Sequence, residues 1–190
     1  METPNTVTPN TVTPNTVTPN TVTPNTSTSQ TSTSQTSTVG VQELGHIVLY
    51  VRNLGRSVDF YANVLGWHQI LDNGPHGGAA AFSGGRTHHE LLLIEVGESA
   101  APIPPGRRVG MYHFGLKVGD TDDQLREMLA RVKARPDLTT VVGMSDHTVT
   151  HSLYVRDPDG NELELYVDVP GVDWKNDPSL FATPTKPFSL

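Results

Sequence analysis

The apolar residues of this chain follow one pattern twice, and each round predicts a strand, a helix and three further strands. In the first round, GHIVLYV at 45–51 predicts a strand, and RNLGRSVDFYANVLG at 52–66 predicts a short helix that Ser57 caps and Gly66 ends. WHQILDN, AAAFSGG and HHELLLIEV then predict three strands, each bounded by Gly, Asn or Asp. The first round is therefore a β-α-β-β-β unit.

The second round follows a Pro-rich linker, SAAPIPPGRRVG, at 99–110. MYHFGLKV predicts a strand, and TDDQLREMLARVKAR predicts a helix that begins with a capping box of Thr121 and Gln124 and ends before Pro136. LTTVVGM, THSLYVRD and NELELYVDV supply the remaining strands. Two β-α-β-β-β modules, at about 43–97 and 110–169, predict an α+β fold.

Two segments lie outside these modules. TPNTV occurs four times over residues 3–22. A polar repeat with Pro in every copy buries too little apolar surface to offset the entropy lost when it becomes ordered. Residues 1–40 are therefore expected to be a disordered low-complexity tail. The folded domain is expected over 41–175. A Pro-rich stretch begins at Pro170, and its last part, residues 176–190, is expected to be an irregular C-terminal arm. The large apolar side chains of the stretch are expected to serve as packing anchors.

Composition narrows the chemistry. The chain has 190 residues and no Cys, so any metal must be held by His, Asp or Glu, which favours Fe(II), Mn(II), Zn(II), Co(II) or Ni(II). The formal charge of −7 includes no basic run, which gives a nucleic-acid or anionic-membrane partner no electrostatic support. Without an apolar run of about 18 residues or the order of a signal peptide, the expected location is cytoplasmic and the expected partner is a small molecule.

The internal repeat suggests a metal site. His46 and His113 occupy the same point in the first strands of the two modules. In the last strand, period-two alternation puts Glu162, Glu164 and Tyr166 on one face. A carboxylate that faces inward needs a partner charge, which a metal bound to both histidines would supply. Two imidazoles and one carboxylate leave about three open positions on a six-coordinate ion, an arrangement suited to non-haem Fe(II).

The paired modules, together with VDFYANVLGW and DPDGNELELYVD, resemble the vicinal oxygen chelate superfamily, which includes glyoxalase I, fosfomycin-resistance proteins and extradiol catechol dioxygenases. The resemblance covers about residues 43–169. It implies that the two modules form a curved mixed sheet around a central metal cleft. It also implies that His46, His113 and Glu164 are the ligands, with Fe(II) or, as an alternative, Mn(II).

Two stretches resemble the extradiol branch. In RTHHELLLIEV, the His89-Glu90 pair resembles the His-Asp pair of that branch, which implies that His89 is an acid/base beside the metal. Strand alternation alone leaves open whether His89 or its neighbours face inward. SDHTVTHSLYVRDPDG implies that Tyr154 hydrogen-bonds the substrate and that His147 stabilises developing charge, with His151 as the competing histidine. Phe114 is expected in the substrate pocket wall.

The expected activity is therefore that of a non-haem Fe(II) extradiol dioxygenase, which opens the ring of a catechol-type diol with O2. We also expect a homo-oligomer. The alternatives are a glyoxalase-like isomerase or lyase, a fosfomycin-type thiol transferase, and a non-catalytic small-molecule binding or resistance protein. The ring substituents and the cleavage position stay open.

Overall fold

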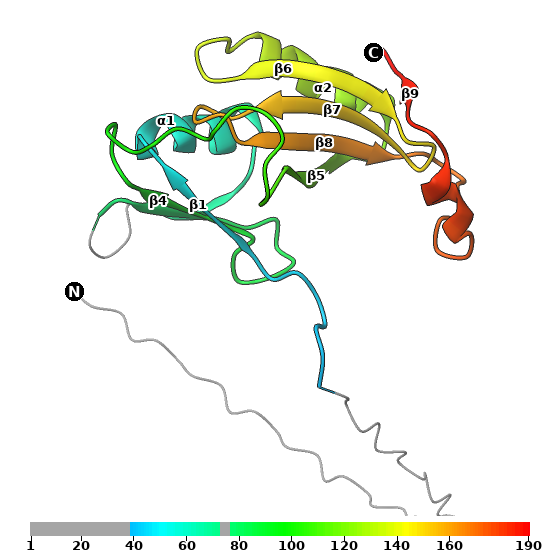
Figure 1. The fold of residues 1–190 in the computed structure, drawn as a ribbon, viewed down its shortest axis with the longest axis horizontal. Coiled ribbons are helices and arrows are strands. Elements are labelled where there is room, and N and C mark those ends of the chain that lie inside the picture. Colours follow the sequence, from blue (N-terminus) through cyan, green and yellow to red (C-terminus); the bar gives the residue numbers. More distant parts are fainter. Residues whose placement is uncertain (1–38, 73–76) are drawn as a thin grey trace, which may run out of the picture. The chain divides into compact units, whose positions relative to one another are not determined.

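The structure is a computed structural model that describes residues 39–72 and 77–190 (Figure 1). The expected disordered tail over 1–40 lies outside the described residues except for its last two positions. Residues 41–190 form one compact unit, which is described below by itself. None of the described helices is long and apolar enough to cross a membrane.

The first module follows the predicted order of elements. Its strands are β1 (Ile47–Val51), β2 (Gln69–Leu71), β3 (Ala79–Phe82) and β4 (Leu91–Glu95), and its helix α1 (Leu54–Val58) continues into the π-helical segment η1 (Asp59–Val64). The sheet order is β1-β4-β3-β2, with β1 parallel to β4 and the other pairs antiparallel. The parallel β1–β4 pair is possible because α1 and η1 carry the chain back across the sheet.

The start of α1 differs from the prediction. Asn53, not Ser57, is the N-cap, and its Oδ1 accepts a hydrogen bond of 3.0 Å from the backbone N of Arg56. Ser57 is buried within the helix, because the helix begins one turn earlier than its apolar residues suggest. Gly66 ends the helical segment in the left-handed conformation, with φ of 74°, as predicted.

The second module repeats this order. It consists of β5 (His113–Gly119), α2 (Asp122–Lys133), β6 (Thr140–Asp146), β7 (Thr150–Arg156) and β8 (Glu162–Asp168). Thr121 is the N-cap of α2 as predicted, and its Oγ1 accepts from the backbone N of Gln124 at 3.3 Å. The returning bond of the box is displaced by one residue, since Gln124 Oε1 accepts from the backbone N of Asp120 at 2.7 Å instead of from that of Thr121. The α+β fold of two β-α-β-β-β modules is thus confirmed.

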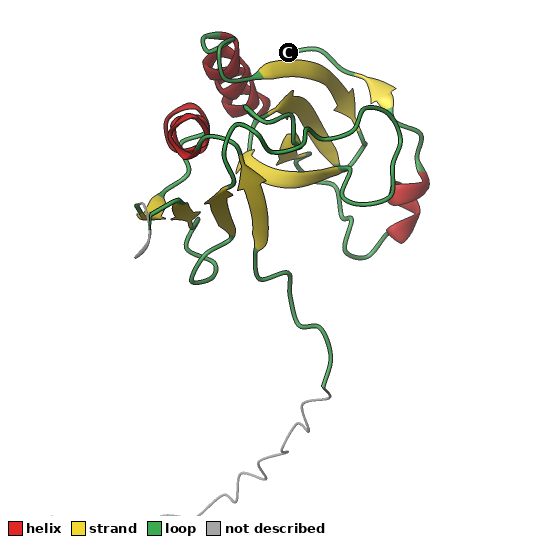
Figure 2. Cartoon of the chain, turned by 60° about the vertical axis from the view of Figure 1, so that its left-hand side comes forward, coloured by secondary structure: helices red, strands yellow, loops and turns green. Residues whose placement is uncertain are grey.

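Residues 170–190, which we call the C-terminal segment, follow β8. They include the 3₁₀ helix η2 (Pro178–Ala182) and the short strand β9 (Lys186–Pro187). β9 pairs with β6 and extends the second sheet to the order β5-β8-β7-β6-β9. Figure 2 shows η2 on the other side of the strands from α1 and α2.

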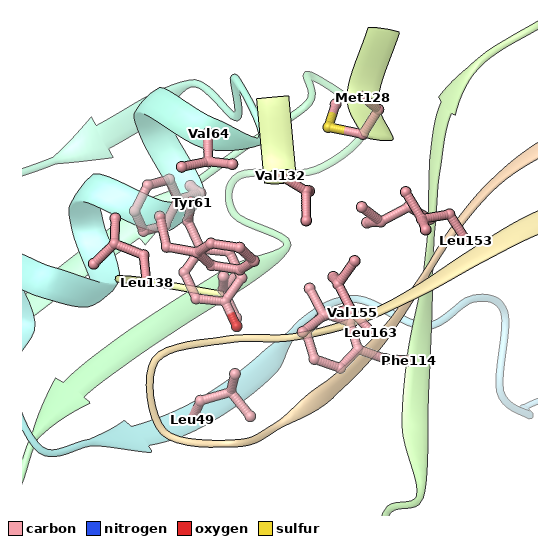
Figure 3. Packing of buried hydrophobic residues seen from close by; sticks show 14 of the residues in the cluster. Leu49, Tyr61, Val64, Phe114, Met128, Val132, Leu138, Leu153, Val155 and Leu163 are labelled. Atoms are coloured by element: carbon pink, nitrogen blue, oxygen red, sulfur yellow. The ribbon is translucent and has the colours of Figure 1, made fainter. Parts of the chain in front are cut away.

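Both modules contribute to one hydrophobic core (Figure 3). The helical segments of the two modules meet in it, with Val64 of η1 near Met128 and Val132 of α2, and the Asp59–Arg135 ion pair of 2.7 Å joins the same region. Along β8 the buried residues alternate with partly exposed ones, so one face of that strand packs on the core. The other face is left for polar side chains.

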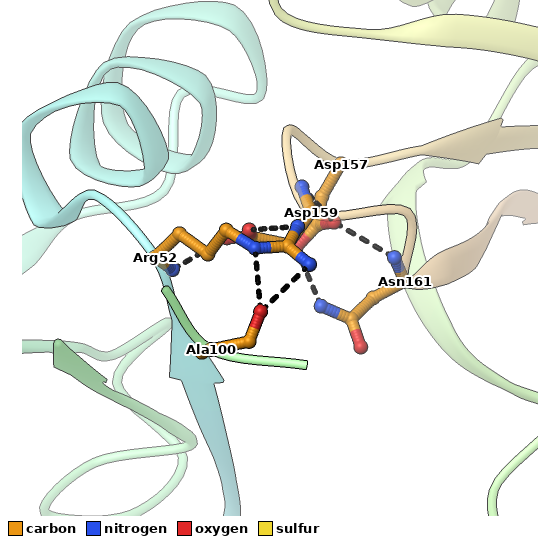
Figure 4. A network of polar contacts seen from close by, with 5 residues as sticks. All are labelled: Arg52, Ala100, Asp157, Asp159 and Asn161. Carbon is orange, nitrogen blue, oxygen red and sulfur yellow. Dashed lines mark hydrogen bonds and ion pairs between the residues drawn. The ribbon is translucent and has the colours of Figure 1, made fainter. Parts of the chain in front are cut away.

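A network of polar contacts ties the turn before β8 to the first module (Figure 4). Asp159 Oδ2 accepts from the backbone N of Arg52 at 3.1 Å, and the Arg52 guanidinium lies 3.4 Å from Asp159 Oδ1. The same guanidinium donates to the carbonyl of Ala100, in the linker between the modules, at 3.2 Å. These contacts connect the end of β1 with the linker and with the turn that leads into β8.

The buried side chain of Asp157 stabilises the turn before β8. Its carboxylate accepts from Tyr61 Oη at 3.0 Å and from the backbone N and Nδ2 of Asn161 at 2.8 and 2.9 Å. Burial raises the pKa of Asp157, and burial followed by the charge of Asp157 raises the pKa of Tyr61. The position of β8 therefore depends on a buried side chain of the first module as well as on its own sheet.

Candidate active site

The closing strand β8 presents carboxylates on the face that turns away from the core. Leu163 and Leu165 are fully buried, whereas Glu162, Glu164 and Tyr166 alternate with them and stay partly exposed, as predicted. β8 pairs in parallel with β5, and Glu164 lies opposite Gly115. A Cβ at position 115 would lie 3.4 Å from the Tyr166 ring and 3.9 Å from Glu164 Oε2, so the glycine leaves room for these two side chains.

His113 and Glu164 form the centre of this face. His113 Nε2 lies 3.2 Å from Glu164 Oε2, and Ser152 Oγ donates to Glu164 Oε1 at 2.6 Å. Across residues 39–72 and 77–190, no Lys or Arg forms an ion pair with Glu164. His113 Nδ1 is buried and has no hydrogen-bond partner among the described atoms. The pair is therefore a partly enclosed imidazole and carboxylate without a fixed cation.

His147 and Tyr154 lie beside this pair. His147 Nε2 is 2.7 Å from Tyr154 Oη and 3.8 Å from Glu164 Oε1, and the Tyr154 and His113 ring centroids are 5.5 Å apart. Burial, followed by the charge of Glu164, raises the pKa of Tyr154 well above its ordinary value. Tyr154 therefore keeps its proton at neutral pH and can act as a hydrogen-bond donor.

The structure separates the two histidines that sequence reasoning left as competitors. His147, in the loop after β6, reaches Tyr154 and Glu164, whereas His151 lies on the other face of β7. There its Nδ1 is 2.7 Å from Asp122 Oδ1 and its ring stacks on Phe188 at 4.3 Å. Of the two, only His147 is among the residues around Glu164.

A cavity of about 540 Å³ opens over these side chains. We call it the module 2 cavity. Its walls come from β5, β7 and β8, from the loop before β7, and from the C-terminal segment, and they include His113, His147, Tyr154, Glu164, Trp174 and Phe181. This volume lies within the range of roughly 300–1,000 Å³ that is usual for small-molecule sites.

A second histidine group belongs to the first module. The ring of His46 lies 4.4 Å from that of His89 and 6.2 Å from that of His88, and the Nδ1 atoms of His88 and His89 are 2.6 Å apart. Burial, then the charges of His46 and His88, lowers the pKa of His89. We call these three residues the module 1 histidines.

The strand alternation considered for RTHHELLLIEV does not apply to its first residues. β4 begins only at Leu91, so His88, His89 and Glu90 lie in the loop before the strand. Glu90 turns toward this loop, where its carboxylate accepts from the backbone N of Gly84 and lies 3.5 Å from Arg86 Nε. His89 faces His46.

The predicted ligand triad is not assembled within the described part of the chain. His113 and Glu164 are paired, while His46 lies with His89 and lines a different cavity, of about 490 Å³. Residues 39–72 and 77–190 contain no group of three or more His, Asp or Glu side chains placed to hold a metal ion. Phe114, expected in the wall of the substrate pocket, is a core residue only 7% exposed; it lines the same cavity as His46 and not the module 2 cavity.

The residues of the second module nevertheless fit two ligand positions of a divalent metal. The 3.2 Å between His113 Nε2 and Glu164 Oε2 is close to the roughly 3 Å that separates neighbouring ligands when each bond is about 2.1 Å. A cation would also balance the Glu164 carboxylate. An imidazole and a carboxylate suit Fe(II), Mn(II) or Zn(II).

Sequence reasoning missed several residues here. Ser152, which hydrogen-bonds Glu164, and Thr185, whose Oγ1 is 3.2 Å from His147 Nδ1, carry no motif. Ser152 could have been found, because it stands two residues before Tyr154 and therefore on the same strand face. Thr185 could not, because the C-terminal segment has no periodic pattern that would place it. The expectation that Trp174 and Phe181 are packing anchors does not hold, since they are 41% and 64% exposed and line the module 2 cavity.

Comparison with known proteins relates this chain to a family that includes enzymes. The sequence model of the Glyoxalase/Bleomycin resistance protein/Dioxygenase superfamily matches residues 43–165. The chain is 35% identical over 134 residues to the catechol-2,3-dioxygenase of Bacillus subtilis (strain 168), which covers 70% of this chain and 44% of that protein. It is 30% identical over 127 residues to biphenyl-2,3-diol 1,2-dioxygenase 2 of Rhodococcus globerulus, which covers 66% of this chain and 63% of that protein.

Among solved structures, the lactoylglutathione lyase from Agrobacterium tumefaciens superposes with a TM-score of 0.50 at 28% identity. The match covers 67% of this chain and 95% of that one. The chain thus spans less than two thirds of either dioxygenase but nearly the whole length of the lyase.

Proposed function

The chain belongs to the glyoxalase/bleomycin resistance protein/dioxygenase superfamily, and from this premise we propose that it is a non-haem Fe(II) extradiol dioxygenase acting on a catechol-type substrate. The observation that carries the proposal is the His113–Glu164 pair of 3.2 Å with Tyr154 and His147 beside it. The similarity to two ring-cleaving dioxygenases of aromatic diols supports the same reaction.

His113 and Glu164 would hold the metal in this proposal. Bound Fe(II), or Mn(II) as the alternative, supplies a Lewis acid for the vicinal oxygens of the diol and a redox centre for O2. Ring opening breaks one carbon–carbon bond of the diol and places both atoms of O2 in the product, so no further reductant is needed.

The neighbouring side chains handle hydrogen bonds and protons. Tyr154 donates a hydrogen bond to a substrate oxygen, and His147 is held between Thr185 Oγ1 at Nδ1 and Tyr154 Oη at Nε2. A histidine fixed at both ring nitrogens keeps one orientation and can pass a proton along the pair. His89 takes the role of the base that removes a substrate proton.

We propose that His46 and His89 reach this site from a second copy of the chain. His46 directly precedes β1, on which Val48 and Tyr50 follow at alternate positions with 45% and 71% of their surface exposed. Exposed apolar side chains grouped on one strand face are typical of a protein contact surface. A homo-oligomer would then supply the third ligand that a single described chain lacks.

The test is made with full-length protein reconstituted anaerobically with Fe(II). On exposure to air and catechol or a substituted catechol, it should consume O2 and form a yellow ring-opened semialdehyde in equal amounts. Iron shown to be bound, together with no O2 consumption over a panel of catechols, would rule out the dioxygenase proposal.

A lyase or isomerase of the lactoylglutathione type is the second candidate, because the chain covers 95% of the Agrobacterium enzyme. It predicts turnover of a glutathione hemithioacetal with Ni(II) or Zn(II) and no O2 uptake. A thiol transferase would instead consume glutathione with fosfomycin, and a binding or resistance protein would take up its ligand stoichiometrically without turnover.

A further inference from the structure

The C-terminal segment, residues 170–190, lies beyond the part of the chain that matches the family, which ends at residue 165. It is nevertheless attached to the second module at several points. β9 pairs with β6 through Ser145–Pro187 and Asp146–Lys186, and the ring of Phe188 stacks on His151 at 4.3 Å with an interplanar angle of 24°. The segment is therefore a fixed part of this module.

This attachment places two aromatic residues in the lining of the site. Trp174 and Phe181 line the module 2 cavity together with His113, Glu164 and Tyr154, and the two residues remain 41% and 64% exposed. The lining of the cavity thus combines hydrogen-bonding side chains with two flat apolar rings. Lys175 Nζ lies over the Trp174 ring, 5.4 Å from its centroid. Exposed aromatic side chains beside hydrogen-bonding groups are typical of a small-molecule site.

We propose that the C-terminal segment forms the ring-binding wall of the active site, with Trp174 and Phe181 as its specificity-determining residues. The substrate is then a planar aromatic diol whose hydroxyl edge faces His113, Glu164 and Tyr154 and whose ring packs on Trp174 and Phe181. The inference rests on the proposed function for the diol, but the ring-binding wall can be tested without turnover.

Two features of the site support this assignment. Aromatic rings attract each other in offset or edge-to-face arrangements beyond the gain from buried area, so a wall of two rings selects an aromatic ring over an aliphatic one of similar size. Thr185 of the same segment contacts His147, so the docked segment also fixes a residue that faces the hydroxyl edge. Binding of the ring and orientation of the polar groups are thereby linked.

Tryptophan fluorescence provides a direct measurement. The chain has two tryptophans, Trp67 and Trp174, so the Trp67→Phe variant reports on Trp174 alone. Full-length, metal-free Trp67→Phe protein is titrated anaerobically with catechol, with 4-methylcatechol and, as the non-aromatic comparison, with cis-1,2-cyclohexanediol. We expect saturable quenching by both catechols and none by cyclohexanediol over the same concentrations.

Variants separate the wall from general effects on folding. In the same background, Phe181→Ala should raise the dissociation constant of catechol about tenfold, which corresponds to about 1.4 kcal/mol for the lost aromatic contact. The dissociation constant of Phe181→Leu should lie between those of the parent and Phe181→Ala, because leucine keeps apolar bulk without the flat ring. Leu180→Ala is the matched control on the same short helix, does not line the cavity, and should bind as the parent does.

The outcomes distinguish this inference from the proposed reaction. Quenching that depends on Phe181, in a protein that shows no O2 uptake, would support the ring-binding wall and contradict the dioxygenase. Absence of saturable quenching, equal binding of cyclohexanediol, or an unchanged dissociation constant in Phe181→Ala would each overturn the wall, even if the enzyme turns over catechol.

Discussion

The two modules share one order of elements but differ at the position that decides their chemistry. In the second module Gly115, two residues after His113, lies opposite Glu164. In the first module Val48, two residues after His46, lies opposite Leu92. The repeat therefore supplies a histidine twice and a carboxylate at this position once. The two modules thus keep the same backbone pairing, while only the second has an imidazole and a carboxylate side by side.

The surroundings of His113 and His46 also differ between the two modules. His113 stands in a strand, with its side chain 26% exposed and with Tyr154 and Glu164 near its ring. His46 lies outside its strand and is exposed, and its neighbours His88 and His89 lie in a loop. A strand residue packed among partners has one orientation, whereas loop residues keep the freedom to adjust to a partner. In the proposed function, the second module would hold the site and the module 1 histidines of another copy would complete it.

The largest effect is expected from His113→Ala. Removing one of the paired ligands should leave no stoichiometric iron after reconstitution and no turnover above background. Elemental analysis of the desalted protein measures this directly. His151→Ala, which changes a histidine on the other face of β7, should keep its iron. Equal iron in the wild type and His113→Ala would show that the second module is not the metal site.

His89→Ala tests whether the module 1 histidines act in proton transfer. Loss of a general base typically costs on the order of 10²–10⁴ in rate, so turnover should fall by that range while bound iron stays at the wild-type level. Stopped-flow kinetics on samples of equal iron content measures this loss of turnover rate. His88→Ala is the neighbouring control, and its turnover rate should fall much less. Loss of iron in His89→Ala would instead make His89 a metal ligand.

Tyr154→Phe should have a smaller effect. The ring that lies 5.5 Å from His113 is kept, and only the hydroxyl that reaches His147 Nε2 at 2.7 Å is removed. A lost hydrogen bond of this kind is worth about 1–2 kcal/mol, so kcat/KM for catechol should fall roughly five- to thirtyfold without loss of iron. An unchanged kcat/KM would remove Tyr154 from the site.

Mixing two inactive variants tests whether the modules of different copies cooperate. His46→Ala and His113→Ala are each expected to be inactive, but in a mixed dimer one site would combine the intact His113 of one copy with the intact His46 of the other. After denaturation and refolding together in equal amounts, activity should recover to about a quarter of the wild type, because half of the dimers are mixed and one of their two sites is intact. No recovery from soluble, refolded protein would contradict the shared site.

The smallest effect is expected at the contact that ties the modules together. Arg52→Ala removes the ion pair with Asp159 and the hydrogen bonds to the carbonyl of Ala100. The Arg52 side chain is 26% exposed and that of Asp159 is 11% exposed. The free energy of unfolding should fall by about 1 kcal/mol, with iron binding retained. Urea unfolding followed by circular dichroism measures this change. Arg56→Ala, in an exposed contact with the carbonyl of Asp137, should change it by less than about 0.5 kcal/mol.

Most of the fold could be predicted because its signals are local. The alternation in β8, the N-cap Thr121 and the glycine after η1 each depend on residues only a few positions apart. The helix start at Asn53 was missed for a local reason as well, since Asn and Ser are both good N-caps and only backbone geometry chooses between them.

The site could be predicted only in part. Glu164, His113, Tyr154 and His147 are brought together, and the choice of His147 over His151 follows from which strand face each occupies. The predicted convergence of His46 with them depended on how the two modules pack. That packing is governed by the shared core and by contacts such as Arg52–Asp159, which join residues more than a hundred positions apart.

By itself, the sequence determined the repeated β-α-β-β-β order, the exclusion of thiolate ligands and the face of β8 on which Glu164 stands, because strand periodicity and composition are properties of the chain alone. Only the tertiary structure decided that the module 1 histidines stand apart from the His113–Glu164 pair and that Trp174 and Phe181 line the same cavity as that pair. The physical reason is that sheet pairing, the packing of a shared core and the docking of β9 on β6 set distances between residues that no local pattern connects.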